Sequence, residues 1–217
     1  MSSRETVLAA IRKGLGRGPL GDGARAALDR RQGATDSDPL LPGLPHGPLA
    51  QVFRAGLEKV AGTMSEIASL DEVPGAVAGY LAGNGLAPEA AVAPSLGALD
   101  WAGAGIAARV GGTRGGDLTG ISLAWRGVAE NGSLVLLSGA DNPTSLNFLP
   151  DHHLVVLRAD DLVPHLESVW KTLRERGEGA WPRTVNVITG PSRTADIELT
   201  IQLGAHGPLS LHVFLIE

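Results

Sequence analysis

A segment near the carboxyl end of the chain carries the densest group of side chains that can bind an anion. Residues 190–198 read GPSRTADIE and follow the apolar run 185–189. Ser192 and Thr194 are hydroxyl donors, and the guanidinium of Arg193 is a planar fork that suits a carboxylate or a phosphate. The apolar spacing that follows predicts that the segment opens a helix, whose free N–H groups attract anions. We expect this anion site at the carboxyl end of a strand, where open α/β sheets bind ligands.

The same residues also have a purely structural interpretation. Ser192 or Thr194 can cap the predicted helix, and Asp196 can complement the helix dipole. Arg193 can pair with Asp196 or with the glutamate two positions later. Residue chemistry alone leaves the structural and the ligand-binding interpretations open.

Two further polar groups stand next to apolar runs. His206 lies in the turn GAHGP before the last run, and its imidazole is either an acid–base group near neutral pH or a hydrogen-bonded structural residue. Glu130 opens the turn ENGS before an earlier run. A carboxylate in such a turn can act as a base or a nucleophile, or it can bond to the N–H groups of its own loop.

Short apolar runs bounded by turn residues predict the strands that would position these groups. Most of the runs are apolar almost without interruption rather than alternating with polar residues. Strands of this kind are usually buried on both faces, in a largely parallel sheet with flanking helices. The predicted strands are residues 90–94, 121–125, 133–139, 153–157, 184–189 and 209–217.

Helical spacing accompanies these runs. The pattern predicts a helix over residues 48–70, with Met64 on its apolar face, and a second helix over residues 71–85. A third apolar stripe lies between the fourth and fifth predicted strands and predicts a βαβ unit. The fold class is therefore α/β. The third stripe consists of Leu162, Leu166, Val169 and Leu173.

The α/β pattern occupies residues 49–217, and we expect one main domain there. Residues 16–48 are rich in Gly, Pro, Asp and Ser and show no sustained period, which predicts a flexible arm or linker. Residues 1–15 predict an N-terminal helix. Its apolar stripe consists of Val7, Leu8, Ile11 and Leu15.

Composition excludes several classes of function. The net charge of −5 argues against a nucleic-acid-binding protein, because such proteins usually carry a basic excess. The chain has no cysteine, which excludes disulfides, thiolate catalysis and cysteine-ligated metal clusters on it. Histidines and carboxylates show no metal-ligand spacing, so no metal site is expected. No apolar run approaches the ~20 residues of a membrane-spanning helix, and the polar start lacks the apolar core of a secretory signal. The expected compartment is the cytoplasm.

Four motifs together resemble the LUD-domain family, and within it the lactate-utilisation C proteins. The motifs are GVAENGSLVLLSG, SLNFLPDHHLVVL, ITGPSRTADIE and GAHGPLSLHVFLIE, and the resemblance runs from about Thr113 to Glu217. The two motifs nearest the carboxyl end, in this order, are the most specific. In the family the turn usually has threonine or serine after its glutamate, whereas this chain has Asn131 there.

The resemblance implies a fold like that of the ribose-phosphate isomerase, glucosamine-phosphate deaminase and CoA-transferase superfamily. It also implies a part in oxidising L-lactate to pyruvate with two partner proteins, of which at least one carries iron–sulfur clusters. No cofactor is expected on this chain, and its lack of cysteine fits that division of labour.

The resemblance also favours the ligand-binding interpretation of the polar segments. We expect one pocket at the carboxyl edge of the sheet, where Arg193 and the helix start hold a small carboxylate such as lactate or pyruvate. Glu130 and His206 are the candidates for proton transfer. The predicted ligand-binding residues are Gly190, Ser192, Arg193, Thr194 and Asp196.

Two other functions remain alternatives. The turn at Glu130 resembles the glutamate turn of family I CoA transferases, which implies acyl transfer through an anhydride on that side chain. The third interpretation is a non-catalytic scaffold or regulatory subunit, in which the helix over residues 1–15 docks a partner through its apolar stripe.

Overall fold

The computed structural model describes residues 3–16, 18–33, 41–177, 181–194 and 202–217. Contacts divide the chain into two compact units, Met1–Leu41 and Pro42–Glu217. None of the helices in the described ranges is long and apolar enough to cross a membrane.

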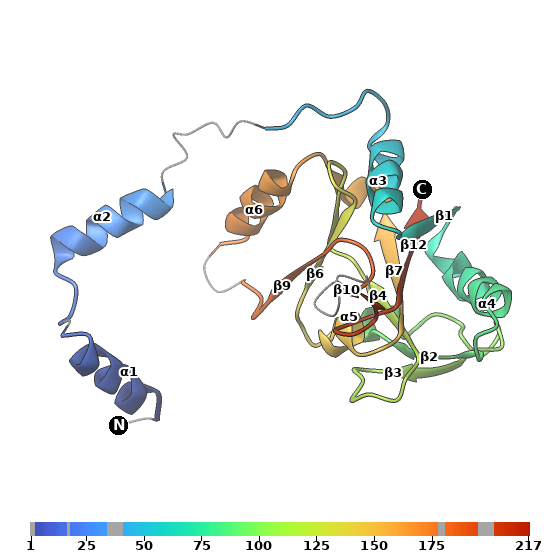
Figure 1. The fold of residues 1–217 in the computed structure, drawn as a ribbon, viewed down its shortest axis with the longest axis horizontal. Coiled ribbons are helices and arrows are strands. Elements are labelled where there is room, and N and C mark those ends of the chain that lie inside the picture. Colours follow the sequence, from blue (N-terminus) through green and yellow to red (C-terminus); the bar gives the residue numbers. More distant parts are fainter. Residues whose placement is uncertain (1–2, 17, 34–40, 178–180, 195–201) are drawn as a thin grey trace. The chain divides into compact units, whose positions relative to one another are not determined.

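The first unit contains two helices, α1 (Ser3–Gly14) and α2 (Asp22–Gly33) (Figure 1). The second of them lies inside the segment 16–48, where the sequence shows no sustained apolar period. Its composition explains this, because α2 is built mainly from Ala, Arg, Asp and Gly, and Leu28 is its one large apolar side chain. The apolar side chains of Val7 and Ile11 in α1, and of Leu15 just after its end, are exposed.

A six-stranded sheet forms the centre of the second unit (Figure 1). Its strand order is β1-β12-β7-β4-β2-β3, and every neighbouring pair is parallel. The prediction of an α/β fold with a largely parallel sheet is confirmed. The strands are β1 (Thr63–Ile67), β2 (Glu89–Val92), β3 (Ala107–Val110), β4 (Thr119–Leu123), β7 (His152–Arg158) and β12 (Ser210–Ile216).

Both faces of this sheet are covered, which explains the nearly continuous apolar runs. On one face, Phe214 packs with Val77 of α4 (Val73–Gly83). On the other face, Val213 packs with Phe53 of α3 (Leu49–Lys59) and with Leu134 of a second sheet. Adjacent residues of β12 thus belong to different apolar cores, as alternation along a strand requires.

The second sheet has four strands in the order β8-β5-β6-β9. Its outer face is covered by α6 (Leu166–Glu175), whose Val169 packs against Val128 and Val135. The short helix α5 (Ser145–Phe148) packs instead against the first sheet, where Leu146 contacts Ala91. The strands are β5 (Arg126–Val128), β6 (Ser133–Leu137), β8 (Leu162–Val163) and β9 (Val185–Ile188).

The predicted βαβ unit is wrong. The predicted strand 153–157 is β7 of the six-stranded sheet, and β8, which contains Leu162 of the predicted helical stripe, lies between β7 and α6. The next predicted strand is β9, which pairs antiparallel with β6 in the four-stranded sheet. Accessibility explains the error, because β9 lies at the edge of its sheet and none of its residues is fully buried. An apolar run of this length does not show to which sheet a strand belongs.

The predicted helix over residues 48–70 is also wrong in its second half. Helix α3 ends at Lys59, and Ala61 adopts a positive φ of 62°, which a continuing helix cannot contain. The chain then forms β1, in which Met64 is buried and pairs with Val213. The helix predicted over residues 71–85 is confirmed as α4, preceded by a 3₁₀ turn at Leu70–Glu72.

The sheets meet where β4 ends. The N–H of Ala124 donates to the carbonyl of Val156 in β7 at 2.9 Å, and the N–H of Trp125 donates to the carbonyl of Val135 in β6 at 2.9 Å. In the six-stranded sheet, β2 connects outward to β3 whereas β4 connects to β7 on the opposite side. The carboxyl ends of β2 and β4 therefore form the point at which the winding direction reverses, where ligands bind in open α/β sheets.

Two histidines lie in the core without a carboxylate. His153 is fully buried, and its Nε2 lies 2.5 Å from the hydroxyl of Ser122. His212 lies between Thr63 and Ser65, whose hydroxyls are 2.7 and 3.0 Å from its two ring nitrogens. Burial disfavours the charged imidazole and lowers the pKa of His153 to about 3 and that of His212 to about 4.

Substitution of Gly132 by alanine should destabilise the protein by about 2–4 kcal/mol, because it adds backbone strain and a steric clash. Gly132 has a φ of +70°, and its missing side chain leaves room for the backbone of α3 at Gly56. Gly79 is the matched control, since it lies in α4 with no neighbour near its Cβ position. Its alanine variant should be neutral or more stable by up to about 1 kcal/mol. Urea unfolding of both variants measures this, and equal stabilities would contradict the close approach.

The free energy of unfolding should fall as the pH drops from about 6.5 toward about 4. In that range the unfolded histidines, with a pKa near 6.5, bind protons that the buried ones do not. Each histidine contributes up to about 1.4 kcal/mol per pH unit. Urea unfolding at several pH values should therefore show a shallower slope for His212→Gln than for the wild type. Identical slopes would show that His212 does not stay neutral in the fold.

Candidate functional site

The structure brings two of the predicted segments together. The N–H of Ser192 donates to the carbonyl of Pro208 at 2.8 Å, and the N–H of Gly204 donates to the carbonyl of Ser192 at 3.1 Å. These bonds place the segment that begins at Gly190 beside the turn that contains His206. The side chains of Arg193 and His206 are both exposed.

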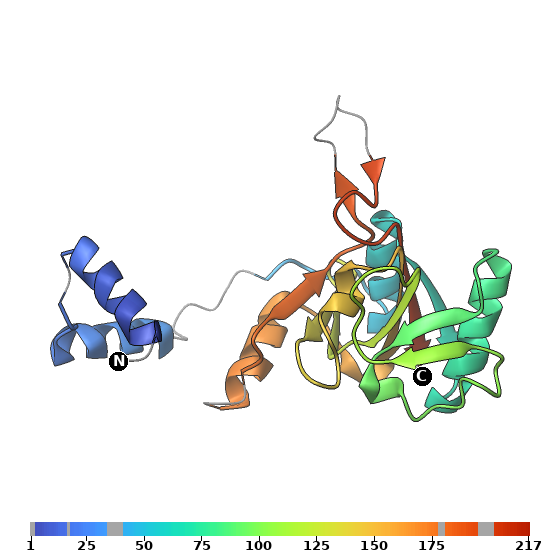
Figure 2. The same ribbon diagram turned by 90° about the horizontal axis from the view of Figure 1, so that it is seen from below.

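The local structure of this segment differs from the prediction. Arg193 and Thr194 do not start a helix, because they form β10 (Arg193–Thr194), which pairs antiparallel with β11 (Gln202–Leu203). Figure 2 shows this pair of strands standing out from the body of the second unit. Asp196 lies outside the described residues.

The expected edge of the sheet is wrong as well. The His206 turn leads into the amino end of β12, and the N–H of Leu209 donates to the carbonyl of Asp151 at 2.7 Å, just before the amino end of β7. Both strands are parallel members of the six-stranded sheet. The turn therefore lies at the amino edge of the sheet, because a connection that precedes a parallel strand meets that edge.

Glu130 lies in a different place and has a different partner. Its carboxylate accepts a hydrogen bond from Nδ1 of His165 at 2.8 Å and another from the N–H of Leu166 at 3.1 Å. Both side chains are largely shielded, with 16% of Glu130 and 12% of His165 exposed. The cavity beside Glu130 is lined by the 42–45 segment, Asn131 and Glu167, and neither Arg193 nor His206 lines it. None of the cavities found in the described residues is lined by both Glu130 and Arg193, so the shared pocket stays a prediction.

His165 is not among the residues predicted for the site, because its one local signal is also that of an ordinary helix start. Its sequence signal is its place directly before α6, where a polar side chain often closes a helix start. The side chain of Asn131 closes the neighbouring turn, because its Oδ1 accepts the N–H of Ser133 at 3.0 Å. An amide thus holds this turn.

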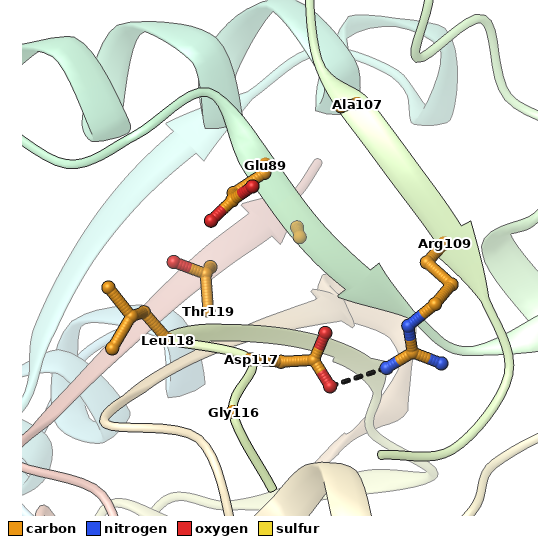
Figure 3. A pocket seen from close by; sticks show the side chains of 8 residues that line it. Glu89, Ala107, Arg109, Gly116, Asp117, Leu118 and Thr119 are labelled. Atoms are coloured by element: carbon orange, nitrogen blue, oxygen red, sulfur yellow. Dashed lines mark hydrogen bonds and ion pairs between the residues drawn. The ribbon is translucent and has the colours of Figure 1, made fainter. Parts of the chain in front are cut away.

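A cavity of about 250 Å³ opens at the amino ends of β2, β3 and β4 (Figure 3). Arg109 points into it and pairs with Asp117 at 2.5 Å. Asp117 also accepts a hydrogen bond from Thr113. This bond is the largest cause of the lowered pKa of the Asp117 carboxyl group, and the pairing with Arg109 lowers the pKa further. Glu89 adds a second carboxylate to the cavity wall. Because Arg109 is already paired with Asp117, this cavity is poorly suited to binding an anion.

A second cavity, of about 280 Å³, lies where the winding of the sheet reverses. The loop that follows β6 forms one wall and is tied to both neighbouring strands. The N–H of Ser95, just after β2, donates to the carbonyl of Asp141 at 3.1 Å, and the Asn142 amide donates to the carbonyl of Leu123 in β4 at 3.2 Å. The lining residues are Ser95, Leu123, Ala124, Trp125, Leu137, Asp141, Asn142, Asp161 and Arg176.

Trp125 organises the charges of this cavity, which we call the switch-point cavity. The guanidinium carbons of Arg126 and Arg176 lie 4.7 and 5.5 Å from the centroid of its ring, within the range of cation–π attraction. Arg126 forms an ion pair with Asp161. Arg176 has no carboxylate partner among the residues that the structure describes. The same ranges contain no cluster of His, Asp and Glu side chains that could hold a metal ion.

Comparison with known proteins identifies the carboxyl-terminal half. Residues 118–216 match the family model of the LUD domain. The resemblance found in the sequence motifs is confirmed. The match includes Glu130, His165, Arg176 and Arg193, and it leaves out the first unit and the strands from β1 to β3.

Curated relatives align over the same part of the chain. A protein named YkgG from Escherichia coli K12 is 36% identical over 100 residues, which are 45% of this chain and 43% of that protein. Lactate utilization protein C of Halalkalibacterium halodurans is 34% identical over 100 residues, 45% of this chain and 44% of the relative. The protein of the same name from Anoxybacillus flavithermus is 33% identical over 98 residues. The aligned part thus spans less than half of each relative.

A solved structure shares the fold. The crystal structure of a DUF162 family protein from Deinococcus radiodurans superposes with a TM-score of 0.58, covering 80% of this chain and all of that one. The identity is 20%, so the likeness concerns the fold alone.

Proposed function

We propose, from the LUD domain at residues 118–216, that this chain serves a lactate-utilisation system and binds a small carboxylate for it. The names of the relatives from Halalkalibacterium halodurans and Anoxybacillus flavithermus support the system. Lactate oxidation releases electrons, and this chain has no cysteine with which to ligate an iron–sulfur cluster. Iron–sulfur partner proteins would therefore carry the electrons, while this chain would handle the carboxylate.

The observation that carries the proposal is the position of Arg176 in the switch-point cavity. A guanidinium without a carboxylate partner among the described residues can take a ligand carboxylate through two parallel N–H···O bonds. Stacking on Trp125 restrains the side chain, so less conformational freedom is lost on binding. The cavity also lies at the point of the sheet where open α/β proteins bind ligands.

Binding by Arg193 remains a competing prediction. Its side chain is exposed on a two-residue strand at the amino edge, and it does not line any of the cavities found in the described part of the chain. The side chain of Arg176 is exposed as well, but it lines a cavity and stacks on Trp125, whereas Arg193 does neither among the described residues. Substitution of the arginine that holds the carboxylate should weaken its binding, and substitution of the other arginine should not.

The geometry at Glu130 favours carboxylate binding over CoA transfer as the function. A nucleophilic carboxylate needs an oxygen that is free to attack the acyl group. Each oxygen of Glu130 accepts a hydrogen bond, one from His165 and the other from the N–H of Leu166 at the start of α6, and these two bonds reduce the nucleophilicity of the carboxylate. In this arrangement the carboxylate positions the helix start, because it supplies an acceptor to a terminal N–H group.

Substitution of Arg176 by glutamine should weaken binding of L-lactate or pyruvate by roughly 3- to 10-fold, because Arg176 is exposed and water reduces the contribution of its ion pair to about 1 kcal/mol. Arg193→Ala is the matched control and should bind like the wild type. Isothermal titration calorimetry measures the affinities, and circular dichroism checks that each variant is folded. Loss of binding in Arg193→Ala with normal binding in Arg176→Gln would move the ligand to the amino edge. Lack of binding of either acid to the wild type would remove the proposal.

A further inference from the structure

We infer that Asp141 makes the switch-point cavity selective for a carboxylate with a hydrogen-bond donor on its α carbon, over the 2-oxo acid. The ligand class is thus a 2-hydroxy or a 2-amino acid. This inference rests on the proposed function, because it concerns the same cavity. It adds a residue that sequence reasoning did not single out and a direction of selectivity.

The backbone around Asp141 is held in place. Its carbonyl accepts the N–H of Ser95, which follows β2, and the next residue, Asn142, donates to the carbonyl of Leu123 in β4. The loop is therefore fastened to both strands whose carboxyl ends form the cavity. A residue fastened in this way presents its side chain from a defined point of the wall.

Two charged side chains of the cavity, one cation and one anion, have no ion-pair partner among the described residues. Arg126 and Asp161 neutralise each other in an ion pair. Arg176 and Asp141 both line the cavity, and neither forms an ion pair within the described ranges, with each other or with another residue. A cavity with this pair of charges complements a small ligand that is anionic at one end and donates hydrogen bonds at the other.

The substituent on the α carbon of the ligand determines whether the ligand can donate a hydrogen bond to Asp141. An ionised carboxylate only accepts hydrogen bonds, so it pairs with a hydroxyl or an ammonium group. The carbonyl oxygen of a 2-oxo acid is also only an acceptor, and two acceptors facing each other repel. Sites that hydrogen-bond a ligand hydroxyl discriminate strongly against analogues that lack it. Because the Asp141 side chain is exposed, water reduces the effect, and we expect about 10-fold rather than the larger factors of dry sites.

Removing the charge of Asp141 while keeping its shape should abolish this selectivity. The amide of Asp141→Asn can donate to a carbonyl oxygen as well as accept from a hydroxyl. The variant should therefore bind pyruvate at least as tightly as the wild type does, and lactate more weakly. Asp160→Asn is the matched control, since it removes the same charge from an exposed residue that does not line the cavity.

Calorimetry with L-lactate, L-alanine and pyruvate at one ionic strength tests the inference. The wild type should bind L-lactate or L-alanine about 10-fold more tightly than pyruvate, Asp141→Asn should bring that ratio close to one, and Asp160→Asn should keep it. Equal affinities for lactate and pyruvate in the wild type, or a ratio unchanged in Asp141→Asn, would overturn the selectivity while leaving carboxylate binding intact.

Other outcomes separate the two proposals further. Binding of L-alanine without binding of L-lactate would support the role of Asp141 and would count against lactate as the ligand. Absence of binding for all three acids would remove the proposed function and this inference with it. Weakened binding in Arg176→Gln, together with a changed ratio in Asp141→Asn, would support both.

Discussion

The arrangement of this protein depends on one transfer of the chain between its two sheets. Ala124 still donates its N–H to β7 of the parallel sheet, and the next residue, Trp125, donates to β6 of the four-stranded sheet. Consecutive backbone groups therefore find partners in different sheets, and no buried N–H is left unpaired at the junction. Because β5 follows directly, the second sheet is held against one face of the first, and the core around Leu134 and Val213 closes between them.

The same junction creates the switch-point cavity. It lies at the carboxyl end of β4, beside β2, where the connections leave the sheet in opposite directions. Trp125 gains a second role there, since its ring attracts two guanidinium groups. Among the described residues, Arg126 has a carboxylate partner and Arg176 has none. Helix α6 separates the two sets of polar groups, because Arg176 follows its carboxyl end whereas the Glu130 and His165 pair is at its amino end. The proposed ligand binding at the cavity and the support of the helix start thus involve separate side chains.

The sequence predicts the elements well where burial is symmetrical. Runs 153–157 and 209–217 are buried on both faces, and both are central strands of the parallel sheet. Prediction fails where a strand is short or lies at an edge. Met64 fits a helical stripe, yet the turn at Ala61 ends the helix and the residue belongs to β1. The run around Val187 looks like a core strand, although β9 is an antiparallel edge strand of the smaller sheet.

By itself, the sequence determined the α/β class, the parallel central sheet and the resemblance to the LUD-domain family from about Thr113 to Glu217, because apolar periodicity and local motifs are properties of neighbouring residues. The tertiary structure alone decided which polar groups meet. It paired Glu130 with His165 and placed the His206 turn at the amino edge. It also left Arg176 facing a cavity with Asp141, 35 positions earlier in the chain. The physical reason is that sheet order and strand direction determine such meetings, and both arise from long-range hydrogen bonds that no local pattern encodes.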